Sequence, residues 1–313
     1  RDCYYACQYA PPHEFGVNIP AALGGLRLDS YQLFSWPARC KKAFQHNVFT
    51  LSLLTGIALG ICLLLLLFSN GISALWHSHT GPGAFYAVIP YWGMVLPALG
   101  IAGFVFIALV KGFATAWRVM GREYQQLKNM KAHWQALWDV MRLKYLDGGG
   151  YGCNYPDDRF RMIRRNFHHL VFYGFVACFV STAIAAVYDH IFHCPAPYPV
   201  LSLPVVFGTL GGVSLVVGTA GLMSLKIRMD KRPAPYSMVG MDIAFIILLF
   251  LVSFTGILLL AFRETSIMGP LLVLHIGLVF GFFISLPYSK FVHGVYRYAA
   301  LVANAIEQTP PKD

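Results

Sequence analysis

Charged residues are scarce in this 313-residue chain, and the acidic ones are the scarcest. Asp, Glu, Lys and Arg make up 12% of it, against roughly 25% in a typical soluble domain. Apolar residues reach 57%, which excludes an ordinary water-soluble fold. The seven cysteines do not indicate a disulfide framework, because Cys62 and Cys178 fall inside long apolar runs, where a thiol packs as a small apolar group.

Six apolar runs are long enough to cross a bilayer, because a helix rises about 1.5 Å per residue and the hydrocarbon core is about 30 Å thick. The predicted spans are residues 48–68, 90–110, 169–187, 201–225, 241–262 and 270–288. A signal peptide does not account for the first run, since five more follow it. The sequence therefore predicts an all-α polytopic membrane protein.

Positive charge is distributed unevenly between the two sides of these spans. Of the 24 Lys and Arg residues, all but Arg263 lie before the first span, between the second and third, between the fourth and fifth, or after the sixth. This pattern predicts that the N- and C-termini are both cytoplasmic. The net charge of +10 is then explained by contact with lipid headgroups, and nucleic acid is not an expected partner.

Two cysteines at the start of the chain have the spacing of iron–sulfur ligands. In bacterial ferredoxins, a C-x₂-C-x₂-C-x₃-C run supplies thiolates to [4Fe–4S] clusters. Cys3 and Cys7 match the last two positions of that run, and the chain begins at Arg1 rather than Met, so we expect the first two ligands upstream. Cys153 is a weaker candidate ligand. The alternative is a pair of thiols on one face of a helix.

Histidines near the predicted cytoplasmic side suggest a b-type haem. His168 and His169 open the third span, and His293 follows the sixth, at the same expected depth. Axial ligation needs two imidazoles on facing helices at matching depth. Either His168 or His169 could be the partner of His293, and His46 could replace either.

His275 precedes His293 by 18 residues, which is five turns of a continuous helix, so both would lie on one face about 27 Å apart. This places His275 near the outer side. It could ligate a second haem, with His79 or His190 as partner, or hydrogen-bond a quinone carbonyl.

The long segment between the second and third spans, residues 111–165, carries aromatic and apolar residues at helical spacing from about 114 to 146. We expect helices beyond the membrane, broken by the glycines at 148–150. Their aromatic surface could dock a partner or the cluster domain, or the helices could pack on each other.

Several motifs together resemble tricarballylate (citrate) utilisation protein B. They are CYYACQYAPPHEFGVNIP at 3–20, HTGPGAFY at 79–86, GCNYP at 152–156 and PAPYP at 195–199. The resemblance implies an N-terminal ferredoxin-like part, a haem-containing membrane part, a flavin (FAD-dependent) dehydrogenase as electron donor and quinone as acceptor.

The end of the sixth span, LPYSKFVH at 286–293 with His275 before it, is also similar to the last helix of the nitrate reductase gamma subunit. That similarity favours His168 as a ligand. The second histidine expected ten residues later is replaced by Cys178, so the cytoplasmic-side haem is supported better than an outer one.

We therefore predict a six-helix, haem-binding bundle (residues 45–300) with a cytoplasmic insertion at 112–166. It follows the end of an iron–sulfur domain and linker (1–44) and precedes a cytoplasmic tail (301–313). The predicted function is electron transfer from a tricarballylate dehydrogenase-like flavoprotein to quinone, as a subunit of an oxidoreductase complex in the bacterial inner membrane. The competing interpretation is a tricarboxylate transporter, suggested by composition and by the Gly/Pro-interrupted fourth span.

Overall fold

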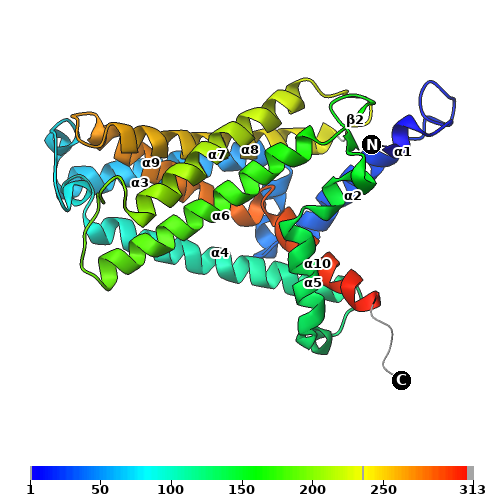
Figure 1. The fold of residues 1–313 in the computed structure, drawn as a ribbon, viewed down its shortest axis with the longest axis horizontal. Helices are drawn as coiled ribbons and strands as arrows, with labels where there is room; N and C mark the ends of the chain where they lie inside the picture. The colour runs from blue at the N-terminus through cyan, green and yellow to red at the C-terminus, as the bar shows by residue number, and fades with distance from the viewer. Residues whose placement is uncertain (1, 235, 309–313) are drawn as a thin grey trace.

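A computed structural model describes residues 2–234 and 236–308 (Figure 1). The last five residues of the predicted tail, 309–313, lie outside the described residues. The α-helices of the described part are α1 Asp2–Tyr5, α2 Ile19–Phe34, α3 Asn47–Ser69, α4 Tyr91–Val119, α5 Met130–Met141, α6 Ile163–His190, α7 Leu203–Ile227, α8 Tyr236–Ala261, α9 Met268–Ser285 and α10 Val292–Glu307. Two short strands, β1 Cys153–Asn154 and β2 Phe160–Arg161, pair antiparallel.

Six of the described helices are long and apolar enough to cross a membrane: α3, α4, α6, α7, α8, and α9 with the 3₁₀ turn Leu286–Tyr288 that follows it. They coincide with the six predicted spans. The prediction of a multi-pass, all-α protein is therefore confirmed. Figure 1 shows the spans running along the longest axis of the molecule, with α5 and α10 gathered at one end. We call this the basic end; there α4 finishes and α6 begins.

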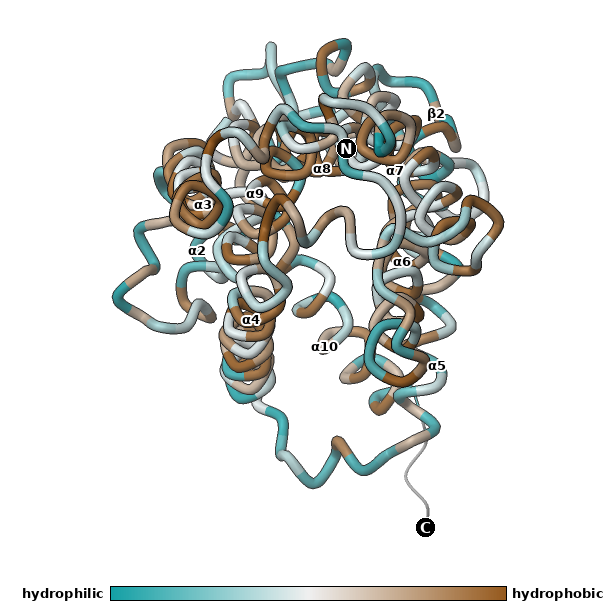
Figure 2. The backbone as a smooth tube through the Cα atoms, turned by 90° about the vertical axis from the view of Figure 1, so that its left-hand side faces the viewer, coloured by the Kyte–Doolittle hydropathy of each residue, from teal (hydrophilic) through white to brown (hydrophobic). Residues whose placement is uncertain are grey.

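Helix α9 is the central helix of the bundle. It packs against α3, α8 and α4, and 56% of its span is buried inside the protein, compared with at most 33% for any other span. Seen nearly end-on in Figure 2, α3, α9 and α4 lie on one side, α6 and α7 on the other, and α8 between them. The outer helices turn apolar side chains away from the protein, as a lipid-facing surface requires.

Glycines allow the tightest helix contacts. A Cβ on Gly211 of α7 would lie 2.8 Å from the carbonyl oxygen of Gly174 on α6, and one on Gly281 of α9 would lie 2.6 Å from the Cα of Thr55 on α3. Small residues at such crossings let backbones approach closely, which favours association where lipid supplies no hydrophobic driving force. Cys178 packs against Gly211, as expected for an apolar thiol.

The segment between the second and third spans builds a compact cap at the basic end. It contains α5 and the β1–β2 hairpin, so the expected helix is present but already ends at Met141, before the glycines. Gly152 begins the hairpin with φ +94°, and a side chain there would collide with the backbone of Arg161. Helix α10 packs against both α4 and α5.

Candidate functional site

A break after α9 sets the position of His293. The expectation of one continuous helix from His275 to His293 is wrong: α9 ends at Ser285, a 3₁₀ turn follows, and Ser289 is extended before α10 begins. Pro287 explains the break, because it has no N–H to donate and its ring clashes with the carbonyl four residues earlier. The five-turn alignment of the two imidazoles therefore does not apply.

The break brings His293 opposite His168 on α6. Their ring centroids lie 6.1 Å apart, and the ring planes differ by 31°. Nδ1 of His293 is 2.5 Å from the carbonyl oxygen of Lys290, which assigns the proton to Nδ1 and leaves Nε2 with its lone pair. Burial lowers the pKa of His293 to about 4, so the imidazole is neutral at pH 7. Nδ1 of His168 is buried and has no hydrogen-bond partner in the described structure.

The separation of these two rings suits ligation of one metal from opposite sides. An imidazole nitrogen lies about 1.2 Å from its ring centre and binds a metal at about 2.0–2.1 Å, so two imidazoles that share one metal ion would have centroids up to about 6.4 Å apart. The observed 6.1 Å is close to that value. The hydrogen bond from a ligand's second nitrogen to a backbone carbonyl is also the usual way such a ring is oriented. The residues present therefore fit the predicted haem.

Both imidazoles line a cavity of about 560 Å³ at the basic end. Its wall is rich in cationic side chains: Arg27, Arg164, Lys226, Lys290 and Arg297, with the single carboxylate Asp242. The five cationic side chains come from α2, α6, α7, α10 and the turn before α10. Residues far apart in the sequence therefore form one positively charged cavity. It has the chemistry to accept a group that carries carboxylates.

Asp242 joins two of these cations. Its carboxylate lies 2.6 Å from Lys226 Nζ and 2.8 Å from Lys290 Nζ, and all three side chains are at most 22% exposed. Burial lowers the pKa of Lys290, and the adjacent carboxylate of Asp242 opposes that change. The three arginines lie outside this network; of these, Arg164 stacks on the ring of Tyr155.

His169 points elsewhere. Its ring contacts that of Tyr173, one turn further along α6, with centroids 5.8 Å apart. Of the two adjacent histidines, His168 is therefore the one whose ring contacts His293. His46 is the residue preceding α3 and is not among the cavity-lining residues.

His275 lies in a different part of the bundle. Its Nδ1 is 3.1 Å from the hydroxyl of Thr255 on α8, and Gly256 leaves room for the ring. The proposed partners are engaged elsewhere: His79 bonds the carbonyl of Ala74, and His190 lies beside the hydroxyl of Tyr91. Among residues 2–234 and 236–308, one pair of imidazole rings is in contact, and it is the pair His168 and His293.

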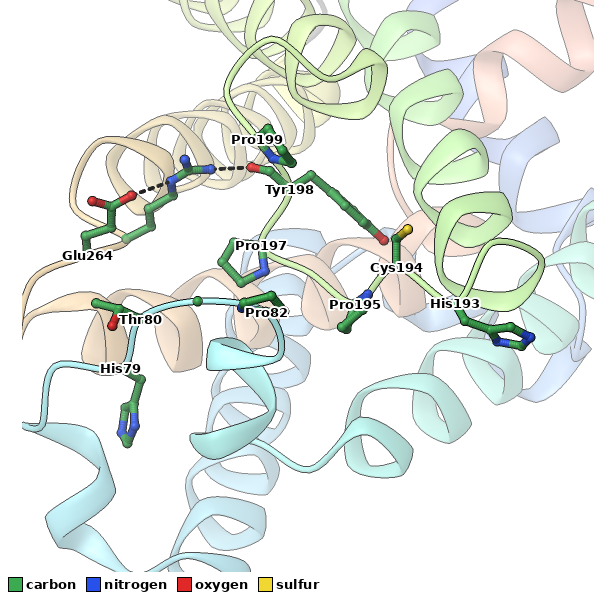
Figure 3. A pocket seen from close by; sticks show the side chains of 12 residues that line it. His79, Thr80, Pro82, His193, Cys194, Pro195, Pro197, Tyr198, Pro199 and Glu264 are labelled. Atoms are coloured by element: carbon green, nitrogen blue, oxygen red, sulfur yellow. Dashed lines mark hydrogen bonds and ion pairs between the residues drawn. The ribbon is translucent and has the colours of Figure 1, made fainter.

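A second cavity, of about 480 Å³, opens at the other end of the bundle (Figure 3). Arg263 lies in its wall, but its guanidinium donates to the carbonyl of Tyr198 (2.6 Å) and lies 3.7 Å from the carboxylate of Glu264. Figure 3 shows the imidazoles of His79 and His193 at its margin, pointing away from each other. The pocket thus has no convergent pair of ligands.

The two N-terminal cysteines are four positions apart in the sequence and do not by themselves form a complete metal site. Cys3 is exposed and Cys7 half-buried. Within the described residues, no cluster of three or more His, Cys, Asp or Glu side chains could hold a metal ion. Further ligands would be needed for a four-thiolate cluster. The segment is anchored to the bundle by a hydrogen bond from the Tyr5 hydroxyl to Asp230.

The cationic wall of the His168–His293 cavity was not predicted from the sequence. One signal was available for Asp242, which is a carboxylate within a predicted span, and such residues are functional candidates by default. No sequence pattern identifies Arg27 or Arg297 as neighbours, because 270 positions separate them.

Six long apolar helices preceded by a short cysteine-bearing segment define an all-α, multi-pass membrane protein. Residues 43–312 match the family described as Citrate utilization protein B, and residues 1–32 match the Citrate utilization protein B Fer4-like domain. The chain therefore belongs to the citrate utilization protein B family.

Citrate utilization protein B of Escherichia coli is 41% identical to this chain over 314 residues, which cover 98% of the chain and 79% of that protein. These matches confirm the resemblance inferred from the motifs, and the Fer4-like domain suggests an iron–sulfur cluster. No solved structure matches the chain.

Proposed function

We propose that this protein is a membrane electron-transfer subunit. It takes electrons from a partner FAD-dependent dehydrogenase similar to tricarballylate dehydrogenase, through a [4Fe–4S] cluster and a b-type haem, and passes them to the quinone pool. The observation that carries the proposal is the pair of imidazoles, His168 and His293, held 6.1 Å apart in a positively charged cavity. The bacterial inner membrane is the proposed location, with the basic end facing the cytoplasm.

In this proposal His168 and His293 would hold the haem, which when bound would supply a one-electron redox centre. Lys290 orients His293 through its backbone carbonyl. The cationic side chains of the cavity wall offset the negative charge of carboxylates, and the surrounding apolar helices exclude water. The Fer4-like segment at the same end supports entry of electrons from a water-soluble partner.

A reduced-minus-oxidised absorption spectrum of the purified protein tests the haem. His168→Ala and His293→Ala should each abolish the low-spin haem signal, because one axial bond is lost, while the protein remains inserted. His169→Ala is the matched control, since the neighbouring ring faces Tyr173 and the spectrum should persist. An unaltered spectrum in the His293 variant would exclude this pair as the haem site.

Electron paramagnetic resonance of the full-length protein tests the cluster. Cys3→Ser or Cys7→Ser should remove a cluster signal and leave the haem spectrum unchanged, because thiolate ligation depends on these side chains and helix insertion does not. Retention of every cluster signal in both variants would mean that the cysteines are structural.

A second candidate function, transport of a tricarboxylate, is favoured by one observation: five cationic side chains and one carboxylate line the same cavity. A transporter would show no haem bands, and the purified protein would bind the tricarboxylate directly. Haem bands that depend on His168 and His293 would decide against it.

A further inference from the structure

Helix α5 exposes a continuous apolar face that no other part of the described protein covers. Met130, Trp134, Leu137 and Trp138 follow the i, i+4, i+7, i+8 pattern of one helix face, and they are 72%, 71%, 43% and 53% exposed. The opposite face carries two alanines that are fully buried against α10. α5 is thus fixed to the protein by small residues and presents its large ones outward.

The position of α5 places this face beside the membrane. Figure 1 shows α5 running crosswise to the spans at the basic end. The hydroxyl of Tyr173 donates to the carbonyl of Met141, the last residue of α5, over 2.7 Å. Tyr173 is ten residues into α6, which is about 15 Å along that helix. The last turn of α5 therefore lies beside the wall of a membrane span.

The length of α6 sets the depth. Its 28 residues extend about 42 Å, whereas the hydrocarbon core is about 30 Å thick. Several residues of α6 must therefore protrude, and a contact about 15 Å from its first residue falls near the boundary between headgroups and acyl chains.

Basic side chains border the apolar face. Lys131 and Arg142 are exposed at its edge, and the guanidinium of Arg142 lies 5.9 Å from the centre of the Trp138 ring. Tryptophan beside a cation is typical of helices that lie in the plane of the interface, where rings enter the headgroup region and cations meet anionic lipid.

We propose that α5 is a monotopic interfacial helix whose apolar face is buried in the lipid leaflet at the basic end, with Lys131 and Arg142 contacting anionic headgroups. The proposal holds whether or not the cavity contains haem.

The lipid contact also bears on the cavity. His133 of α5 lies 2.8 Å from the hydroxyl of Tyr298 on α10, and α10 begins with the turn that carries His293. An α5 helix held by the bilayer therefore helps to keep α10 in place.

Fluorescence quenching in nanodiscs tests this inference with the full chain. Trp138→Phe keeps Trp134, and the variant Trp134→Phe with Trp138→Phe supplies the background from the remaining tryptophans. The difference signal should be quenched by acyl chains brominated near the headgroup and resist aqueous iodide.

The matched control moves the reporter by one residue, to the polar side of α5. Adding Gln135→Trp to the double phenylalanine variant should give a signal that iodide quenches and brominated lipid does not, since Gln135 is exposed and lies away from the apolar face. Quenching of Trp134 by iodide alone, or equal quenching at both positions, would overturn the proposal and leave the face for a protein partner.

Discussion

Replacing Asp242 by asparagine should destabilise the protein by leaving two largely shielded ammonium groups without a counter-charge. The carboxylate lies 2.6 Å from Lys226 Nζ and 2.8 Å from Lys290 Nζ, with side-chain exposures of 21%, 13% and 22% respectively. At an effective dielectric constant of about 20, each contact supplies about 6 kcal/mol of Coulomb attraction. Desolvation of the three charges and repulsion between the two cations offset most of this.

The net cost follows from the buried environment. Removing one partner of a buried ion pair typically costs about 3–5 kcal/mol, because the remaining charge is uncompensated. At about 2 °C per kcal/mol, the midpoint of thermal unfolding in detergent should fall by roughly 6–10 °C. The triple variant Asp242→Asn, Lys226→Met, Lys290→Met should recover most of that loss, because apolar replacement of a whole buried network is often neutral.

Asp157→Asn is the matched control. Asp157 pairs with Arg161 over 3.2 Å, but both side chains are more than 40% exposed, so the loss should be below about 1 kcal/mol. Equal melting temperatures for the Asp242 and Asp157 variants would refute the argument that the cavity network is shielded from solvent.

Three further predictions follow from other parts of the fold. Gly281→Ala should cost about 1–3 kcal/mol in thermal stability, because the new methyl group would lie 2.6 Å from Thr55; Gly60→Ala, with open space around it, should be neutral or slightly stabilising, and the idea fails if both behave alike. If the proposed haem and partners are correct, His275→Ala should leave the proposed basic-end haem reducible by the proposed dehydrogenase but slow its reoxidation by quinone in stopped-flow absorbance. Normal reoxidation would show that His275 only packs. Hydrogen bonds from Arg232 hold the pKa of Asp230 at about 2, below the ordinary 3.8. The Arg232–Asp230 contact therefore stabilises the fold fully above pH 3.8, and this stabilisation is lost as the pH falls through 2. Hydrogen-exchange protection of residues 2–18 should decline over that range, and Asp230→Asn should show the low-pH behaviour at neutral pH; unchanged protection in that variant would contradict the anchoring role.

The six spans could be predicted from the sequence because hydrophobic length is a local property. A run of about twenty apolar residues has no stable alternative to a helix once it is in lipid, where every backbone group must be bonded internally. The family could be inferred for a similar reason, since short motifs such as GCNYP at 152–156 are contiguous in the chain. The candidate histidines could be predicted from their expected depth in the membrane, because that depth follows from the boundaries of the spans alone.

Which histidines meet depended on the tertiary structure. The sequence predicts one continuous helix from His275 to His293. In the structure Pro287 ends α9, and the turn that follows places His293 opposite α6. The orientation of α6, set by its close contact with α7, then selects His168 over His169. No pattern within one segment contains that information, because it is a relation between two helices.

The charged wall of the cavity depends on the tertiary structure even more than the pairing of the histidines does. Arg27, Lys226, Asp242 and Arg297 belong to four different helices and become neighbours only when those helices meet at the basic end. In the sequence, Arg27, Lys226 and Arg297 each resemble an ordinary charge that interacts with water or lipid headgroups. The sequence by itself determined the spans, their number and the distribution of charge along the chain. Packing alone decided which charged side chains line one cavity. The physical reason is that the hydrophobicity of a segment is a property of its own residues, whereas the distance between two side chains on different helices depends on how the whole bundle packs.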